Sequence, residues 1–225
     1  MQHEDEPEGT LAFIEGYLRR SYFHRGWFEI GRADAAEGEM ESVERTLGIL
    51  TALLNADIDD EHFAELCQLL GMEYQEFDGE PTFRDIVTDL HAGMLEGLAI
   101  RTLALTKVPG STRDQEGDSL YQHQQFLGGH FYQSWVEHEP PPSATGYIIG
   151  SMPGSIWAER MLGALSAFLH MDIPNEDFRE LCSSYGVDYR EIRGHPTFRE
   201  ILEQVRAGML KGLTERTLAL VNDLT

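Results

Sequence analysis

The stretch GEPTFRDI, residues 79–86, returns almost unchanged as GHPTFREI at residues 194–201. The match extends on both sides of this stretch. Residues 57–105 align with residues 172–220 at a constant offset of 115 and without a gap, and 27 of the 49 aligned positions are identical. Identity at this level indicates an internal tandem duplication, so we expect two copies of one structural unit.

The upstream part of the two copies aligns less simply. A Glu-Arg-x-Leu-Gly motif keeps the offset of 115, at residues 44–48 and 159–163. Aromatic and acidic residues further upstream match at an offset of 108: Phe23, Trp27 and Glu29 with Phe131, Trp135 and Glu137. The second copy therefore carries extra residues, and we assign them to EPPPSATGYIIGSMPG at 139–154, whose prolines and glycines predict a loop.

These boundaries predict a chain of four parts. They are an acidic N-terminal tail at 1–9, a first helical repeat at 10–107, a polar linker at 108–117, and a second helical repeat at 118–225 that contains the inserted loop 139–154.

Apolar residues recur with the period of a helix. In EHFAELCQLLG, Phe63, Leu66, Cys67 and Leu70 follow one another at steps of three, one and three, as on one face of a helix. No segment alternates convincingly with a period of two over the length of a strand. The sequence predicts an all-α fold with roughly four helices in each copy.

The repeated stretch contains a helix start. Thr82 with Asp85, and Thr197 with Glu200, fit the capping box, in which a threonine hydroxyl and an acid three residues later bind the free amides of the first turn. We expect a long helix to begin at each of these positions.

Glycines recur inside both predicted long helices, as Gly93 and Gly97 and again as Gly208 and Gly212. A glycine within a helix costs about 1 kcal/mol relative to alanine, so a close helix–helix crossing is expected there. The expected partner is the same helix of the other copy, which would give a pseudo-twofold dimer within one chain.

Two pairs of arginines require partners. Arg84 and Arg199 stand in a first helical turn, where the helix dipole disfavours a cation. Their partner is either a carboxylate within the fold or an anionic ligand or acidic peptide. Arg101 and Arg216 lie in apolar sequence and need buried ion pairs, for which Glu44 and Glu159, or Glu65 and Glu180, are available.

Two tryptophans are candidate binding residues. Trp27 and Trp135 are each followed two residues later by an acid, Glu29 and Glu137. Tryptophan is common at binding hot spots, although packing in the core is the competing interpretation.

Three histidines of the second copy, His123, His130 and His138, are candidate metal ligands, with Glu137 beside them. Exposed helical histidines are the alternative, and the cofactor is unknown. No Walker loop, GxSxG or HExxH motif occurs in the sequence.

The composition bears on partners and location. The net charge is −22, with 39 acidic and 17 basic residues, and such a field repels nucleic acid and anionic membrane surfaces. The two cysteines form no CxxC motif, the first residues have no apolar signal core, and no apolar run reaches the length of a membrane span. A cytoplasmic protein is expected.

These features together favour a non-catalytic helical protein-binding module: an adaptor, scaffold or assembly chaperone. Its partner would be another protein, and homo-oligomers are possible. The alternative is a protein that binds a small ligand, cofactor or metal, possibly an enzyme, with its pocket between the two repeats.

Overall fold

A computed structural model describes residues 26–69, 81–106, 141–153, 155–184 and 196–222. These residues form eight helices and no strand, which confirms the all-α prediction. The helices are α2 (Trp27–Glu37), α3 (Met40–Leu54), α4 (Asp60–Leu69), α5 (Phe83–Thr106), α8 (Pro142–Gly150), α9 (Ile156–His170), α10 (Asn175–Ser184) and α11 (Phe198–Asn222).

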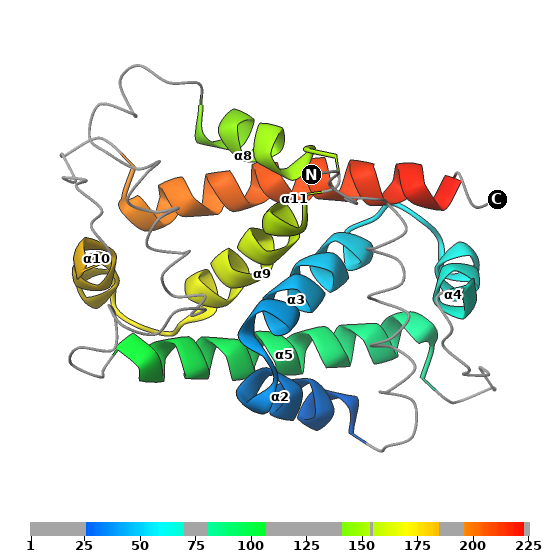
Figure 1. The fold of residues 1–225 in the computed structure, drawn as a ribbon, viewed down its shortest axis with the longest axis horizontal. Coiled ribbons are helices and arrows are strands. Elements are labelled where there is room, and N and C mark those ends of the chain that lie inside the picture. The colour runs from blue at the N-terminus through cyan, green and yellow to red at the C-terminus, as the bar shows by residue number, and fades with distance from the viewer. Residues whose placement is uncertain (1–25, 70–80, 107–140, 154, 185–195, 223–225) are drawn as a thin grey trace, which may run out of the picture.

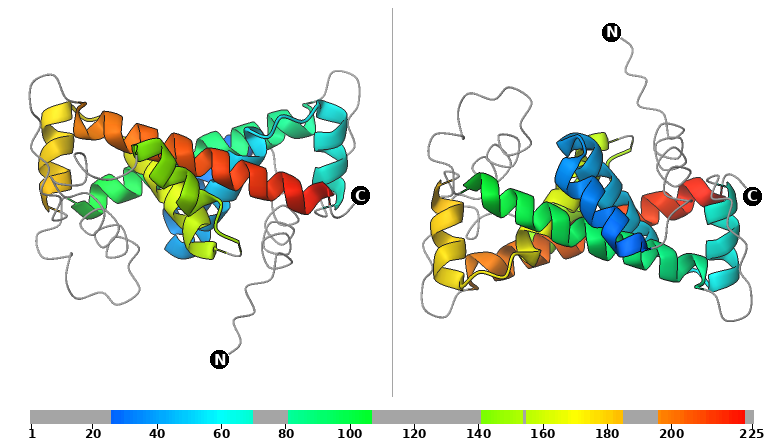
Figure 2. Two further views of the ribbon diagram at one scale, coloured as in Figure 1. Left: turned by 90° about the horizontal axis from the view of Figure 1, so that it is seen from above. Right: turned by 90° about the horizontal axis from the view of Figure 1, so that it is seen from below.

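Two short central helices lie between two long ones (Figure 1). α3 and α9 run side by side in the centre, with α5 along one side and α11 along the other. α2 packs on α5 and α8 packs on α11, while α4 and α10 stand at opposite ends of the molecule. In the views from above and below, the two long helices α5 and α11 cross each other obliquely (Figure 2).

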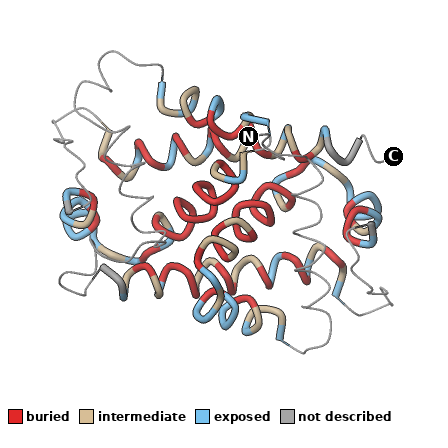
Figure 3. Tube along the Cα trace, viewed as in Figure 1, coloured by how far each residue is buried: buried red, intermediate tan, exposed pale blue. Residues whose placement is uncertain are grey.

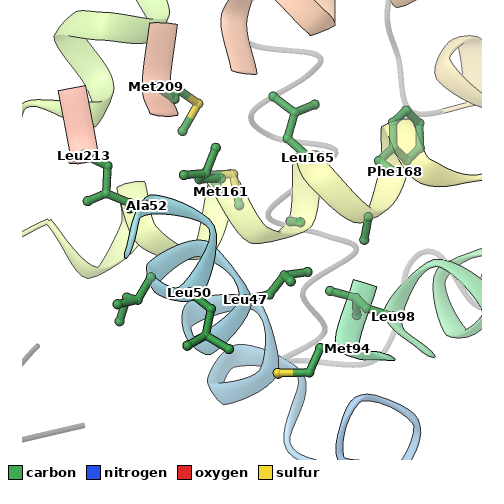
Figure 4. Close-up of a cluster of buried hydrophobic side chains, with 14 of the residues drawn as sticks. Leu47, Leu50, Ala52, Met94, Leu98, Met161, Leu165, Phe168, Met209 and Leu213 are labelled. Atoms are coloured by element: carbon green, nitrogen blue, oxygen red, sulfur yellow. The ribbon is translucent and has the colours of Figure 1, made fainter. Parts of the chain in front are cut away.

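The core lies around the two central helices (Figure 3). Eleven of the fifteen residues are buried in each of α3 and α9, as expected for helices that are apolar around most of their circumference. Figure 4 shows that one cluster combines side chains of four helices: Leu47 and Leu50 of α3, Met94 and Leu98 of α5, Met161 and Leu165 of α9, and Met209 and Leu213 of α11.

Both predicted capping boxes are present. At the start of α5 the Asp85 amide donates to Thr82 Oγ1 at 3.1 Å, and the Thr82 amide donates to Asp85 Oδ2 at 2.9 Å. At the start of α11 the Glu200 amide donates to Thr197 Oγ1 at 3.2 Å, and the Thr197 amide donates to Glu200 Oε2 at 2.6 Å. The hydrogen bonds that the two carboxylates accept from Thr82 and Thr197 lower the pKa of both acids.

The expected loop at 139–154 is wrong for most of its length, because Pro142–Gly150 forms α8. Proline is compatible with the first turn of a helix, since the first amides of a helix have no partner within the helix. Pro142 occupies that turn. The prolines therefore mark the beginning of a helix here and not a loop.

The glycines of the long helices face α2 and α8, not each other, so the expected partner is wrong. A Cβ added at Gly93 would overlap the carbonyl oxygen of Phe28 in α2, and one added at Gly97 would lie 2.6 Å from that of Arg32. The same holds in the second half of the chain. There, a Cβ at Gly208 would overlap the Ser143 oxygen of α8, and one at Gly212 would lie 2.6 Å from the oxygen of Tyr147.

The short helices contribute glycines of their own to these crossings. A Cβ at Gly31 would overlap the carbonyl oxygen of Leu90, and one at Gly146 would overlap that of Val205. Each residue of the second pair stands 115 positions after its counterpart in the first. In packing, an offset of 115 therefore relates α2 to α8, which differs from the offset of 108 expected for Trp27 and Glu29. Residues 115 apart are called matched positions below.

Candidate functional site

The central helices α3 and α9 approach each other at Gly48 and Gly163. A Cβ on Gly48 would overlap the carbonyl oxygen of Glu159, and a Cβ on Gly163 would overlap that of Glu44. The distance between packed helices depends on the side chains at the contact. Because the obstructing atoms here are backbone, this approach requires glycine on both helices.

Buried ion pairs surround this crossing. Arg45 Nε lies 2.7 Å from Glu159 Oε2, and Arg160 Nη2 lies 3.2 Å from Glu44 Oε2. Both carboxylates are fully buried. Arg216 Nη2 also donates to Glu159, and Arg160 Nη1 lies 2.9 Å from Glu41 Oε1 at the rim of the network.

The predicted ion pair of Arg216 with Glu159 is thus present. Burial lowers the pKa of Arg216, while the Glu159 charge raises it. Its matched residue Arg101 is held differently, because its Nη1 donates to the backbone oxygens of Gly38 at 2.7 Å and Ala35 at 3.2 Å.

Arg84 is held within the fold. Its Nε donates to Asp60 Oδ1 at 2.6 Å and its Nη2 to the Ile58 oxygen at 2.7 Å, and the guanidinium lies 4.3 Å from the centre of the Phe63 ring. The internal carboxylate proposed from the sequence is therefore found, and it ties α4 to the start of α5.

Arg199 makes the matched set of contacts. It donates to Asn175 Oδ1 at 3.0 Å and to the Ile173 oxygen at 3.1 Å, and it lies 4.1 Å from the centre of the Phe178 ring. Here the side-chain partner is an amide and not a carboxylate. A role of Arg84 and Arg199 in binding an anionic partner stays a prediction.

Trp27 begins α2, is partly buried and packs against the core, as the core-packing interpretation requires. Glu29 is exposed and lies 3.8 Å from Arg32. The other candidates, Trp135, Glu137, His123, His130 and His138, lie outside the described residues. Within the described ranges no group of three or more His, Cys, Asp or Glu side chains is arranged to hold a metal ion.

One matched pair of hydrogen bonds joins the central helices to the long ones. The Thr51 hydroxyl donates to the Leu47 oxygen at 2.6 Å, so its oxygen accepts from His91 Nε2 at 3.0 Å. The Ser166 hydroxyl donates to Leu162 and accepts from Arg206 Nε at 2.8 Å. The same position thus carries a neutral ring in one half and a guanidinium in the other.

His91 makes the stability of the fold depend on pH. Burial, together with the charges of Arg206 and His170, lowers the pKa of His91 from 6.5 to about 4. The unfolded chain therefore binds more protons between these values. The contribution of neutral His91 to the free energy of unfolding is therefore complete above pH 6.5. The free energy of unfolding falls by about 2–3 kcal/mol as the pH drops to 4.

Urea unfolding of the native protein and of His91→Gln between pH 7 and 4 measures this loss, and the variant should show a flatter profile. His62→Gln is the control: Asp59 raises the pKa of exposed His62, so this change acts with the opposite sign. Parallel profiles for the native protein and His91→Gln would show that His91 does not carry the effect.

Exposed apolar side chains are concentrated in the segment where α8 leads into α9. Of the five large apolar residues found exposed among the described residues, four lie here: Tyr147 (37% exposed), Ile148 (53%), Met152 (45%) and Ile156 (43%). We call these four residues the α8–α9 apolar surface. The fifth, Ile100, lies on α5.

The matched positions in the first half are mostly charged. They are Arg32, Ala33, Glu37 and Glu41. Arg32 Nε pairs with Glu96 at 3.4 Å, whereas the Tyr147 hydroxyl donates to Glu215 at 2.7 Å and its ring centre lies 5.5 Å from Lys211 Nζ. The loop predicted at 139–154 gave no reason to expect exposed apolar residues at Tyr147, Ile148 and Met152.

None of the described helices is both long and apolar enough to cross a membrane. The chain matches no protein-family model, no curated protein and no solved structure. Any functional inference therefore depends on the molecule's own surface.

Proposed function

We propose that the chain is a tandem duplication of a four-helix unit, packed as a pseudo-twofold dimer within one polypeptide. The reciprocal contacts of α3 and α9 support this: Gly48 faces Glu159 and Gly163 faces Glu44, and each of these acids pairs with an arginine of the other helix. α4 and α10, and likewise α5 and α11, begin 115 residues apart.

We further propose that the protein is a non-catalytic cytoplasmic binding module, an adaptor, scaffold or assembly chaperone, which docks another protein on the α8–α9 apolar surface. The observation that carries this proposal is the contrast between matched positions. A fold that accepts Arg32, Glu37 and Glu41 in one half does not need Tyr147, Met152 and Ile156 in the other. Grouped exposed apolar residues are typical of protein-binding surfaces.

Exposed apolar residues also lower the solubility of a protein. Binding to a partner is therefore the simplest explanation of the α8–α9 apolar surface. Removing apolar side chains from water contributes roughly 25 cal/mol for each Å², and this gain becomes available when a partner covers the surface. The alternative from the sequence, a ligand or metal site between the repeats, stays a prediction.

Site-specific crosslinking tests the proposal. A photo-crosslinking amino acid at Ile148, introduced in the native host, should give a covalent adduct with a second polypeptide, while the same amino acid at matched Ala33 should not. The adduct should disappear when Tyr147→Arg, Met152→Glu and Ile156→Glu are added. Equal adducts at both positions, or an adduct that survives these changes, would contradict the proposal.

A further inference from the structure

We propose that the α8–α9 apolar surface binds one basic amphipathic helix of a partner protein per chain. This inference rests on the proposed function and adds to it the chemistry and the number of the partners.

The charge of the molecule selects a basic partner. With 39 acidic and 17 basic residues and a net charge of −22, the protein repels a second copy of itself and attracts a cationic segment. Immediately beside the surface, Glu215 and Lys211 both contact Tyr147 and offset each other. The preference therefore comes from the field of the whole molecule.

The exposed apolar residues occupy a short stretch of the chain. Ile148 lies in the last turn of α8, Met152 in the turn that follows α8, and Ile156 opens α9. One helical segment of a partner can cover a stretch of this length, and an amphipathic helix presents a row of apolar side chains three or four residues apart for such a contact.

The first half does not offer a second site. At the matched position of Tyr147 stands Arg32, which pairs with Glu96 at 3.4 Å while both side chains are 40–45% exposed. Covering this pair would remove two hydrated charges from water, a cost that often exceeds their mutual attraction. Glu37 and Glu41 replace two further apolar residues, so each chain should bind a single segment.

Two synthetic peptides test the proposal directly. Both carry leucines at helical spacing, and one has lysine and arginine on its polar face whereas the other has glutamate. Isothermal titration of the full-length protein should give a 1:1 complex with the basic peptide, and at least about tenfold weaker binding of the acidic one.

The decisive variant replaces the four residues of the α8–α9 apolar surface by the residues at the matched positions of the first half. The changes are Tyr147→Arg, Ile148→Ala, Met152→Glu and Ile156→Glu. This variant makes the net charge more negative by one, so binding by charge alone would be retained. We expect it to bind the basic peptide at least about tenfold more weakly. The control Gln204→Asp also installs a first-half residue at an exposed position, changes the charge equally, and should bind normally.

Circular dichroism of the four-site variant should match that of the native protein if the variant folds. Ile148→Ala alone, at an exposed position, should still weaken binding about threefold. Equal weakening by Gln204→Asp would overturn the proposal, as would two peptides per chain. Equal affinity for both peptides would reject the basic partner but leave the crosslinking result, and hence the proposed function, in place. A concentration-dependent dimer in sedimentation, lost in the four-site variant, would identify a second copy as the occupant and reject the proposal.

Discussion

Replacing Gly163 by alanine should destabilise the protein by about 2–3 kcal/mol, although a glycine-to-alanine change within an ordinary helix stabilises it by about 1 kcal/mol. The added Cβ would overlap the carbonyl oxygen of Glu44. Because this atom belongs to the backbone of α3, no side chain can rotate away, and the two central helices must move apart. Urea unfolding followed by circular dichroism measures the change.

The matched change Gly48→Ala should cost a similar amount, and the double variant should cost less than the sum of the two. Once α3 and α9 have moved apart for one methyl group, the second meets less resistance, so the two effects are coupled. Ala33→Gly at an exposed position of α2 measures the helix-propensity contribution in the same chain. A gain in stability for Gly163→Ala would show that the helices do not cross as closely as described.

Replacing Glu159 by glutamine should cost about 3–4 kcal/mol of unfolding free energy, because the change takes the buried Glu159 carboxylate away from two largely buried guanidinium groups. The Glu159 side chain is 1% exposed, and those of its partners Arg45 and Arg216 are 13% and 12% exposed. Glutamine has nearly the same shape, so the loss reports the charge and not a cavity.

Denaturant unfolding of Glu159→Gln beside Glu176→Gln gives the comparison. Glu176 is exposed on α10, and its replacement should change stability by no more than about 0.5 kcal/mol. Glu44→Gln should also be costly, since Glu44 is fully buried and bonded to Arg160. Equal effects of Glu159→Gln and Glu176→Gln would mean that the central network contributes nothing to stability.

The sequence predicted best what depends on neighbouring residues. The starts of α5 and α11 follow from a threonine and an acid three residues later, because a capping box is closed within one turn. The internal carboxylate expected for Arg84 is present, whereas the same expectation for Arg199 is wrong, because its side-chain partner is an amide. Which residue serves, Asp60 in one half and Asn175 in the other, depends on how α4 and α10 dock, and the local sequence does not fix this.

Contacts between distant helices were predicted less well. Gly93 and Gly97 indicate that some backbone comes close, but a stripe of small residues does not specify which helix supplies it. In the sequence, the relation between α2 and α8 is indicated by the matched glycines Gly31 and Gly146. These are a single identical pair in two stretches that otherwise differ, so the relation is easily overlooked. The apolar surface was missed for a related reason, since Ile148 and Ile149 look alike in sequence and only Ile149 is buried.

The burial of α3 also affects the synthesis of the protein. Much of the cover of α3 is α9, which begins at Ile156, more than a hundred residues after Met40. At about 5–20 residues per second, the ribosome needs on the order of 6–20 s to make the intervening chain. Throughout this interval α3 has emerged without its main neighbour. Its exposure to other nascent chains therefore depends on the speed of translation, which the stability of the finished fold does not determine.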